Sequence, residues 1–159
     1  MYMKTTKIIV IFFVLATLIS CKPNDWLDWK TQNEIWLQEN AKKEGVKTTS
    51  SGLQYKCIVP GIPQSSGNVD DNKIVKIKYS GELINGYDFD SSEEYENYVN
   101  AFVPGFVEGL KLMKEFGIYE LYIPHELGYG AQGMGSEGTI SHIPPYSTLI
   151  FRVELLDVY

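Results

Sequence analysis

Residues 79–92 read YSGELINGYDFDSS, which is two strand-like runs with a turn sequence between them. The pair Asn85-Gly86 separates two runs of strand-forming residues, and both residues tolerate the positive φ angles of a tight hairpin turn. The stretch therefore predicts two antiparallel strands joined by a short turn. An antiparallel sheet commonly buries only one face, so the rest of the chain must supply what covers it.

Further strand-like runs lie on both sides of this hairpin. The strand before the turn extends over residues 74–84 and the strand after it over 87–90, and other runs occupy 53–59, 118–123 and 147–158. In the last run, apolar residues alternate with mainly polar ones, as expected for a strand with one buried face. The sequence thus predicts an antiparallel sheet.

One short helix is available to cover this sheet. Apolar residues recur at helical spacing in GFVEGLKLMKEFG, residues 105–117, after a proline that suits a helix start and before a glycine that suits its end. A sheet of several strands with one covering helix predicts an α+β domain, which we place at residues 53–159.

The chain begins with a basic and then apolar segment. Lys4 and Lys7 precede an apolar run over residues 8–19, which is too short to span a bilayer but suits an export signal. The run ends in LISC, residues 18–21, which resembles the cleavage site of bacterial lipoprotein signals and implies a lipid on Cys21. Several acyl chains on one residue hold a protein stably at a membrane. A plain signal peptide and an N-terminal anchor that keeps its cysteine are the alternatives.

Residues 21–52 are predicted to connect this signal, residues 1–20, to the domain. Residues 24–45 have a helical pattern, and 46–52 form a polar link. Three tryptophans share one face of the predicted helix: Trp26, Trp29 and Trp36. This stripe has three interpretations, namely docking on the domain, a homodimer contact, or a position at the membrane interface. The opposite face carries both signs of charge, which favours the first two.

Charge, histidine and cysteine content narrow the function classes. The chain holds 14 Lys and Arg against 20 Asp and Glu, and removal of a signal with two lysines leaves a net charge of −8. This excess of acid argues against nucleic acid as a partner. His125 and His142 show no ligand spacing, so we expect no metal site. Cys57 lies in an apolar strand-like run and is expected to be a buried, inert thiol.

The run GYGAQG, Gly128 to Gly133, fits the G-x-G-x-x-G pattern of dinucleotide-binding loops. That pattern requires a helix directly after the glycines, so that the helix N-terminus meets the phosphates. Further glycines and Pro144-Pro145 follow instead, and they favour a glycine-rich surface loop. A nucleotide-dependent enzyme would need phosphate bound at this loop, and a redox enzyme would need an exposed Cys57.

Three segments, in this order and spacing, resemble the FKBP-type peptidyl-prolyl cis–trans isomerases. They are YSGELINGYDFDSS at 79–92, FVPGFVEGLKLM at 102–113, and LGYGAQGMGSEGTISHIPPYSTLIFRVELL at 127–156. The resemblance covers residues 53–158 and implies a half-open antiparallel β-sheet wrapped on one short helix, with a prolyl pocket between them. It also implies isomerase activity with no cofactor and no covalent intermediate.

The resemblance assigns nine residues to the pocket. The catalytic residues that it implies are Asp90, Tyr129, Phe89 and Phe151. The substrate-binding residues that it implies are Tyr79, Phe102, Val103, Phe106 and Ile143. Tyr79 is expected to form a hydrogen bond with Asp90. The Tyr129 hydroxyl and the backbone N–H of Ile143 are expected to hold substrate carbonyls.

Some positions depart from the family pattern. Phe106 stands where many relatives have tryptophan, so the pocket floor offers less contact area, and His142 replaces an aliphatic residue common at the rim. Between residues 91 and 99 the pattern is lost, and either Tyr95 or Tyr98 supplies the usual aromatic side chain.

The implied function is to assist the folding of exported proteins at the bacterial cell envelope. The expected partners are proline-containing polypeptides and a membrane, with the outer membrane preferred because Lys22 rather than aspartate follows Cys21. The alternative is a chaperone or binding module of the same fold with weak or no turnover, because Phe106 and the 91–99 segment alter the pocket.

Overall fold

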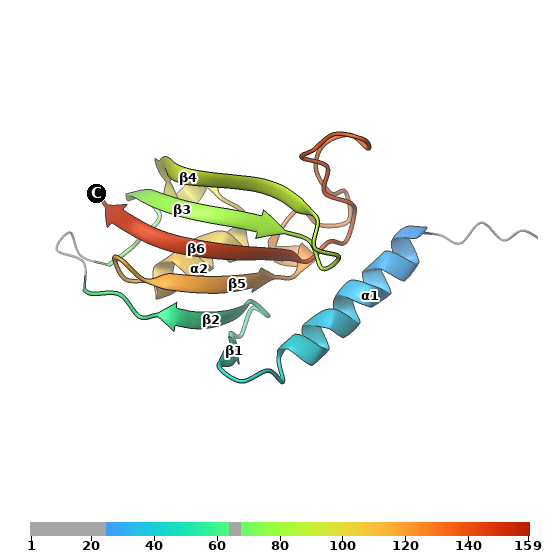
Figure 1. Cartoon of the computed structure of the whole chain (residues 1–159), viewed down its shortest axis with the longest axis horizontal. Helices are drawn as coiled ribbons and strands as arrows, with labels where there is room; N and C mark the ends of the chain where they lie inside the picture. Colours follow the sequence, from blue (N-terminus) through green and yellow to red (C-terminus); the bar gives the residue numbers. More distant parts are fainter. Residues whose placement is uncertain (1–24, 64–67) are drawn as a thin grey trace, which may run out of the picture.

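The computed structural model describes residues 25–63 and 68–159 (Figure 1). Its strands are β1 (Val46–Thr48), β2 (Gln54–Val59), β3 (Ile74–Glu82), β4 (Asp88–Tyr98), β5 (Ile118–Ile123) and β6 (Leu149–Val158). Its helices are α1 (Asp25–Asn40), α2 (Pro104–Leu112) and the 3-10 turns η1 (Val99–Ala101) and η2 (His125–Leu127). The strands form one antiparallel sheet in the order β1-β2-β5-β6-β3-β4. The predicted α+β architecture, with a helix before it, is confirmed.

The predicted hairpin joins β3 and β4. Gly86 adopts a φ of 78°, the Gly86 N–H donates to the Leu83 carbonyl at 2.8 Å, and the Leu83 N–H donates to the Tyr87 carbonyl at 3.0 Å. Strand β4 continues to Tyr98, well beyond the predicted end at residue 90, because it pairs with the full length of β3. Charged pairs Lys76–Glu94 and Lys78–Glu93 link the two strands on the exposed side. β4 is the last strand in the sheet, and no other strand of the described residues pairs with its outer edge.

Helix α2 packs against the sheet through two glycines. A Cβ on Gly105 would meet Ile123, and one on Gly109 would meet Leu121, so only glycine allows this close approach to β5. Figure 1 shows α2 behind the sheet, where it covers the buried face. The helix ends at Leu112, earlier than the predicted residue 117, because Met113 already has extended backbone angles.

Helix α1 is docked on the domain. The Trp29 Nε1–H donates to Ser147 Oγ at 2.9 Å, and the Trp36 ring lies 5.7 Å from the Tyr122 ring, centroid to centroid. Two of the three tryptophans thus pack as the docking interpretation requires, whereas Trp26 is 37% exposed. Within the predicted polar link, β1 pairs with β2, which the sequence did not indicate.

Cys57 is exposed, so the prediction of a buried thiol is wrong. The physical reason is the shortness of β1, which pairs only with Gln54–Lys56 and leaves the end of β2 at an uncovered edge. Exposure meets one requirement of the redox interpretation, but no other cysteine lies within the described residues.

The predicted signal segment, residues 1–20, and Cys21 lie outside the described residues. Within the part of the chain that the structure covers, no helix is both long and apolar enough to cross a membrane. The same residues contain no group of three or more His, Cys, Asp or Glu side chains placed to hold a metal ion.

Candidate functional site

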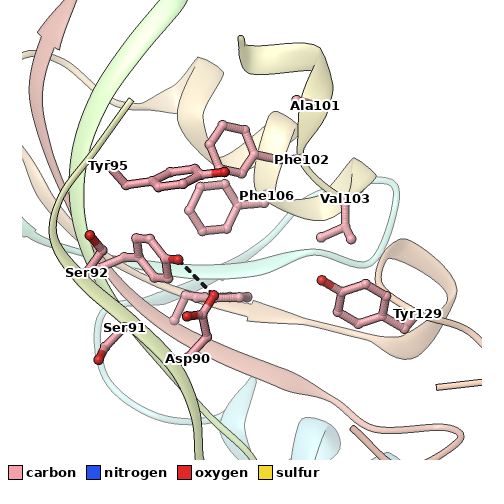
Figure 2. Close-up of a pocket in the computed structure, with 11 residues that line it drawn as sticks. Asp90, Ser91, Ser92, Tyr95, Ala101, Phe102, Val103, Phe106 and Tyr129 are labelled. Atoms are coloured by element: carbon pink, nitrogen blue, oxygen red, sulfur yellow. Dashed lines mark hydrogen bonds between the residues drawn. The ribbon is translucent and has the colours of Figure 1, made fainter. Parts of the chain in front are cut away.

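A cavity of about 600 Å³ lies between α2, β4 and the loop after β5 (Figure 2). Eleven residues line it: Tyr79, Asp90, Ser91, Ser92, Tyr95, Ala101, Phe102, Val103, Phe106, Tyr129 and Phe151. They come from both strands of the hairpin, from the start of α2, from the glycine-rich loop and from β6. The cavity is within the size range of small-ligand sites.

Aromatic rings form most of its apolar surface. Phe106 is 3% exposed, and its ring lies 4.8 Å from the Phe102 ring and 4.9 Å from the Phe151 ring. Tyr79 completes this group, with its ring 6.1 Å from Phe151. Because the rings meet mostly edge to face, they fix one another in place. The floor of the cavity is therefore a preformed apolar surface.

One hydrogen bond fixes the polar part of the cavity. The Tyr79 hydroxyl donates to Asp90 Oδ2 at 2.8 Å, as the dashed line in Figure 2 shows. Burial, and then this hydrogen bond, raise the pKa of Tyr79 above its usual range. Tyr79 therefore stays protonated at neutral pH and keeps the carboxylate of Asp90 oriented at the cavity wall.

Tyr129 faces the cavity from the glycine-rich loop. Burial raises the pKa of its hydroxyl, and the nearby charge of Asp90 adds to this effect. Gly130 anchors the loop, since its N–H donates to the His125 carbonyl at 2.8 Å and its carbonyl accepts from the Tyr146 N–H at 2.9 Å. The Tyr129 hydroxyl thus remains a hydrogen-bond donor at neutral pH.

Seven of the nine sequence-predicted residues line the cavity, and Phe89 and Ile143 do not. Phe89 is 5% exposed and packs at 5.3 Å against Phe151, so it supports the wall from behind. Gly81 makes room for both rings, because a Cβ there would lie 2.6 Å from the Phe89 ring. Ile143 is 1% exposed and its N–H donates to the Met134 carbonyl at 2.8 Å. The expectation that this N–H holds a substrate carbonyl is wrong, because the donor is already used.

The structure resolves the choice between Tyr95 and Tyr98. Tyr95 lines the cavity, with its ring 5.9 Å from Tyr79 and 6.0 Å from Phe102, whereas Tyr98 is 53% exposed and does not line it. His142, expected at the rim, lies instead beside a separate pocket with Tyr87.

Val103 offers the backbone donor that Ile143 does not. It precedes α2 with extended backbone angles and lines the cavity, and its N–H makes no hydrogen bond with another described residue. The proline that follows it was the available signal, because proline favours the first position of a helix and so marks Val103 as the residue before that helix.

Residues 66–156 match a family model described as FKBP-type peptidyl-prolyl cis-trans isomerase. The chain belongs to the FKBP-type isomerase family. Residues 27–57 match a second model, the domain amino terminal to FKBP-type peptidyl-prolyl isomerase, which corresponds to α1 and the first two strands.

Individual FKBP-type relatives agree with this membership. The FKBP-type 22 kDa peptidyl-prolyl cis-trans isomerase of Escherichia coli K12 is 46% identical over 127 residues, which make up 77% of this chain and 58% of the relative. FkpA of the same organism is 38% identical over 138 residues, 84% of this chain and 48% of the relative. The chain spans about half the length of the curated relatives it matches.

Solved FKBP-type structures share the fold. The crystal structure of FkpA from Escherichia coli matches with a TM-score of 0.76 and 38% identity, over 84% of this chain and 61% of that one. The crystal structure of AtFKBP13 matches with a TM-score of 0.61 and 30% identity, over 70% of this chain and 96% of that one.

Proposed function

We propose that this protein is a peptidyl-prolyl cis–trans isomerase that acts on proline-containing polypeptides. The observation that carries the proposal is the aromatic cavity with the Tyr79–Asp90 pair at its wall, in a chain of the FKBP-type family. A proline ring is small and apolar, and the peptide bond before it adds a carbonyl that the polar groups at the wall can hold. They suit a cavity of about 600 Å³ lined by rings.

The reaction requires no nucleophile, because rotation about a peptide bond breaks no covalent bond. Its barrier of about 18–20 kcal/mol comes from amide resonance. A twisted amide has lost that resonance, so its carbonyl carries less separated charge and loses less when it leaves water. An apolar cavity therefore stabilises the twisted state more than the planar one, which is the condition for catalysis. A gain of about 10⁴-fold requires only about 5–6 kcal/mol.

Polar groups at the wall hold the substrate in one pose. We assign the Tyr129 hydroxyl and the Val103 N–H to substrate carbonyls, since both residues line the cavity and neither donor has a hydrogen-bond partner among the described residues. The Asp90 carboxylate lies against the twisted amide, oriented by Tyr79. Phe106 and Phe151 form the apolar floor under the proline ring.

A protease-coupled assay on a proline tetrapeptide tests this function. Asp90→Asn keeps the shape of the side chain but removes its charge, so we expect kcat/KM to fall about tenfold or more, a loss of roughly 1.4 kcal/mol. Asp88→Asn is the matched control, because Asp88 is exposed on the same strand and does not line the cavity. If wild type and Asp90→Asn are equally inactive while the protein still suppresses client aggregation, the binding-module alternative replaces the enzyme.

We also propose that the protein acts at the cell envelope, attached to a membrane through a lipid on Cys21. Support comes from the sequence alone, in the basic and apolar run that ends at LISC. The substrates would then be exported chains that fold after translocation. Cys21→Ser is expected to move the protein from the membrane fraction to the soluble fraction of cells. A variant that stays with the membrane contradicts lipid attachment.

A further inference from the structure

Helix α1 binds the segment that leads from the glycine-rich loop into β6. The Trp29 Nε1–H donates to Ser147 Oγ at 2.9 Å, and the Ser147 hydroxyl in turn donates to the Pro144 carbonyl at 2.7 Å. One turn further along the helix, Asn33 Oδ1 accepts a hydrogen bond from the Thr148 N–H at 2.7 Å. Two side chains of α1 thus hold two consecutive residues of this connection, Ser147 and Thr148.

The Asn33–Thr148 hydrogen bond is buried, and the Trp29–Ser147 and Ser147–Pro144 bonds are partly buried. Asn33 and Thr148 are each 1% exposed, and Ser147 is 3% exposed. The second polar atom of Asn33 is also used, because its Nδ2 donates to the Trp29 carbonyl at 2.8 Å. A buried polar group without a partner loses its hydration as well as its bond, so water cannot readily replace these contacts. The position of α1 on the segment is therefore well defined.

Tyr146 connects α1 to the glycine-rich loop. Its backbone has a φ of 62°, which a non-glycine residue adopts only when its surroundings hold it there. Its ring lies between α1 and η2, with Lys30 Nζ 5.4 Å from the ring centroid and the His125 ring 5.2 Å away. Its N–H donates to the Gly130 carbonyl at 2.9 Å.

Gly130 is the residue next to Tyr129, whose side chain lines the cavity. A continuous set of contacts therefore runs from Trp29 and Asn33, through residues 146–148, to the backbone of the cavity tyrosine. Catalytic side chains need supporting contacts that fix them within fractions of an ångström. Helix α1, which does not itself line the cavity, supplies that support from outside.

We propose that Trp29 and Asn33 are positioning residues that set substrate affinity by fixing the Tyr129 loop. The inference rests on the proposed function, since it assigns Tyr129 to a substrate carbonyl. Without these contacts the connection gains freedom, and the Tyr129 hydroxyl spends less time where the substrate needs it.

The test uses the full chain with Trp29→Phe and Asn33→Ala. Each is expected to raise the KM for a proline tetrapeptide roughly three- to tenfold, with a smaller change in kcat. Partial unfolding would instead lower the active fraction and leave KM unchanged. Trp36→Phe is the matched control, because it weakens the docking of α1 on Tyr122 without contact to residues 144–148. Equal KM changes in Trp29→Phe and Trp36→Phe overturn the inference.

A double-mutant cycle with Tyr129→Phe tests whether α1 affects KM through the Tyr129 hydroxyl. If α1 acts through the Tyr129 hydroxyl, Trp29→Phe changes KM less than twofold once that hydroxyl is absent. Fully additive effects overturn the inference, and so does a Tyr129→Phe variant with wild-type KM.

Hydrogen exchange separates this inference from the proposed function. The amides of Gly130 and Tyr146 are expected to exchange faster in Trp29→Phe than in Trp36→Phe. If the wild type shows no turnover, the proposed function fails, and the Kd of the same peptide replaces KM in every comparison above. Unchanged exchange at both amides overturns the inference whatever the turnover.

Discussion

At the floor of the cavity, the ring of Phe106 serves the core and the site at once. It is 3% exposed, stacks on Phe102 and packs against Phe151. A change at Phe106 therefore alters stability together with activity. Tyr95 is a cleaner probe of the site, because it is 38% exposed and contacts the cavity from the rim.

Tyr95→Ala is expected to lower kcat/KM for a proline tetrapeptide about tenfold, because it removes one aromatic wall that contacts Tyr79 and Phe102. Tyr98→Ala removes the same kind of side chain from the same strand, but from outside the cavity. Its kcat/KM is expected to stay within twofold of the wild-type value. Both are measured in the protease-coupled assay. The reverse order of effects would place the site elsewhere.

Individual site residues were predictable where a local motif fixes them. Tyr79 and Asp90 flank the hairpin turn, so antiparallel pairing alone brings their strands together. The choice of Tyr95 over Tyr98 was not predictable, because β4 carries one extra residue between the pairs Tyr79–Ser92 and Ile77–Tyr95. Such a bulge shifts the side-chain alternation by one and turns Tyr95 to the cavity side.

Among the elements, α2 and β5 approach each other closely. Gly105 and Gly109 bring the helix backbone against Ile123 and Leu121. The same helix starts directly after Val103, at the cavity wall. The packing of α2 therefore determines both the thickness of the core and the position of the donor at its start.

Gly109→Ala is expected to destabilise the protein by about 1–3 kcal/mol, because the added methyl group meets the Leu121 side chain and pushes the helix away from β5. The measurement is a urea unfolding curve. Lys111→Ala on the same helix is the control, since it removes only an exposed ion pair with Asp71 and is expected to cost less than about 1 kcal/mol. A stability for Gly109→Ala equal to wild type would show that the helix can shift freely.

Most elements followed from local sequence signals, and the exceptions share a cause. The hairpin, α2 and β6 carry turn residues, a proline or a clear alternation. Three features depend instead on which strands pair in the sheet. They are the formation of β1, the exposure of Cys57 and the full length of β4. Local sequence patterns contain no information about which strands pair. The sequence also left three interpretations of the α1 tryptophan stripe open, because it does not show which surface the helix packs against.

Across the whole molecule, burial raises the pKa of several tyrosines. It is the leading cause at Tyr79, Tyr122 and Tyr129, and at Tyr119, where the pKa reaches about 12. In the unfolded chain, tyrosines ionise near pH 10. Above that pH the unfolded state binds fewer protons than the folded state. The raised pKa values therefore contribute stability that is fully present below about pH 10. This stability is lost as the pH rises through the folded-state pKa values.

The free energy of unfolding is therefore expected to fall between about pH 10 and pH 12, by no more than about 1.4 kcal/mol per pH unit for each tyrosine. Urea unfolding at a series of pH values measures this slope. Tyr122→Phe removes a tyrosine that donates to Glu120 at 2.6 Å, so its slope is shallower than that of the wild type. Equal slopes in Tyr122→Phe and the wild type would contradict the prediction.

If Cys21 carries the proposed lipid, the start of α1 at Asp25 also limits how far the domain can stand from that lipid. Four residue steps reach at most about 14 Å when fully extended. With that lipid in place, the first turn of the helix would lie within about twice the thickness of one headgroup region from the lipidated residue. The docking of α1 through Trp29 would then keep the domain close to the membrane as well. Such a short tether would let the proposed isomerase sample polypeptides as they emerge at the membrane surface, and would keep it from those that have already diffused away.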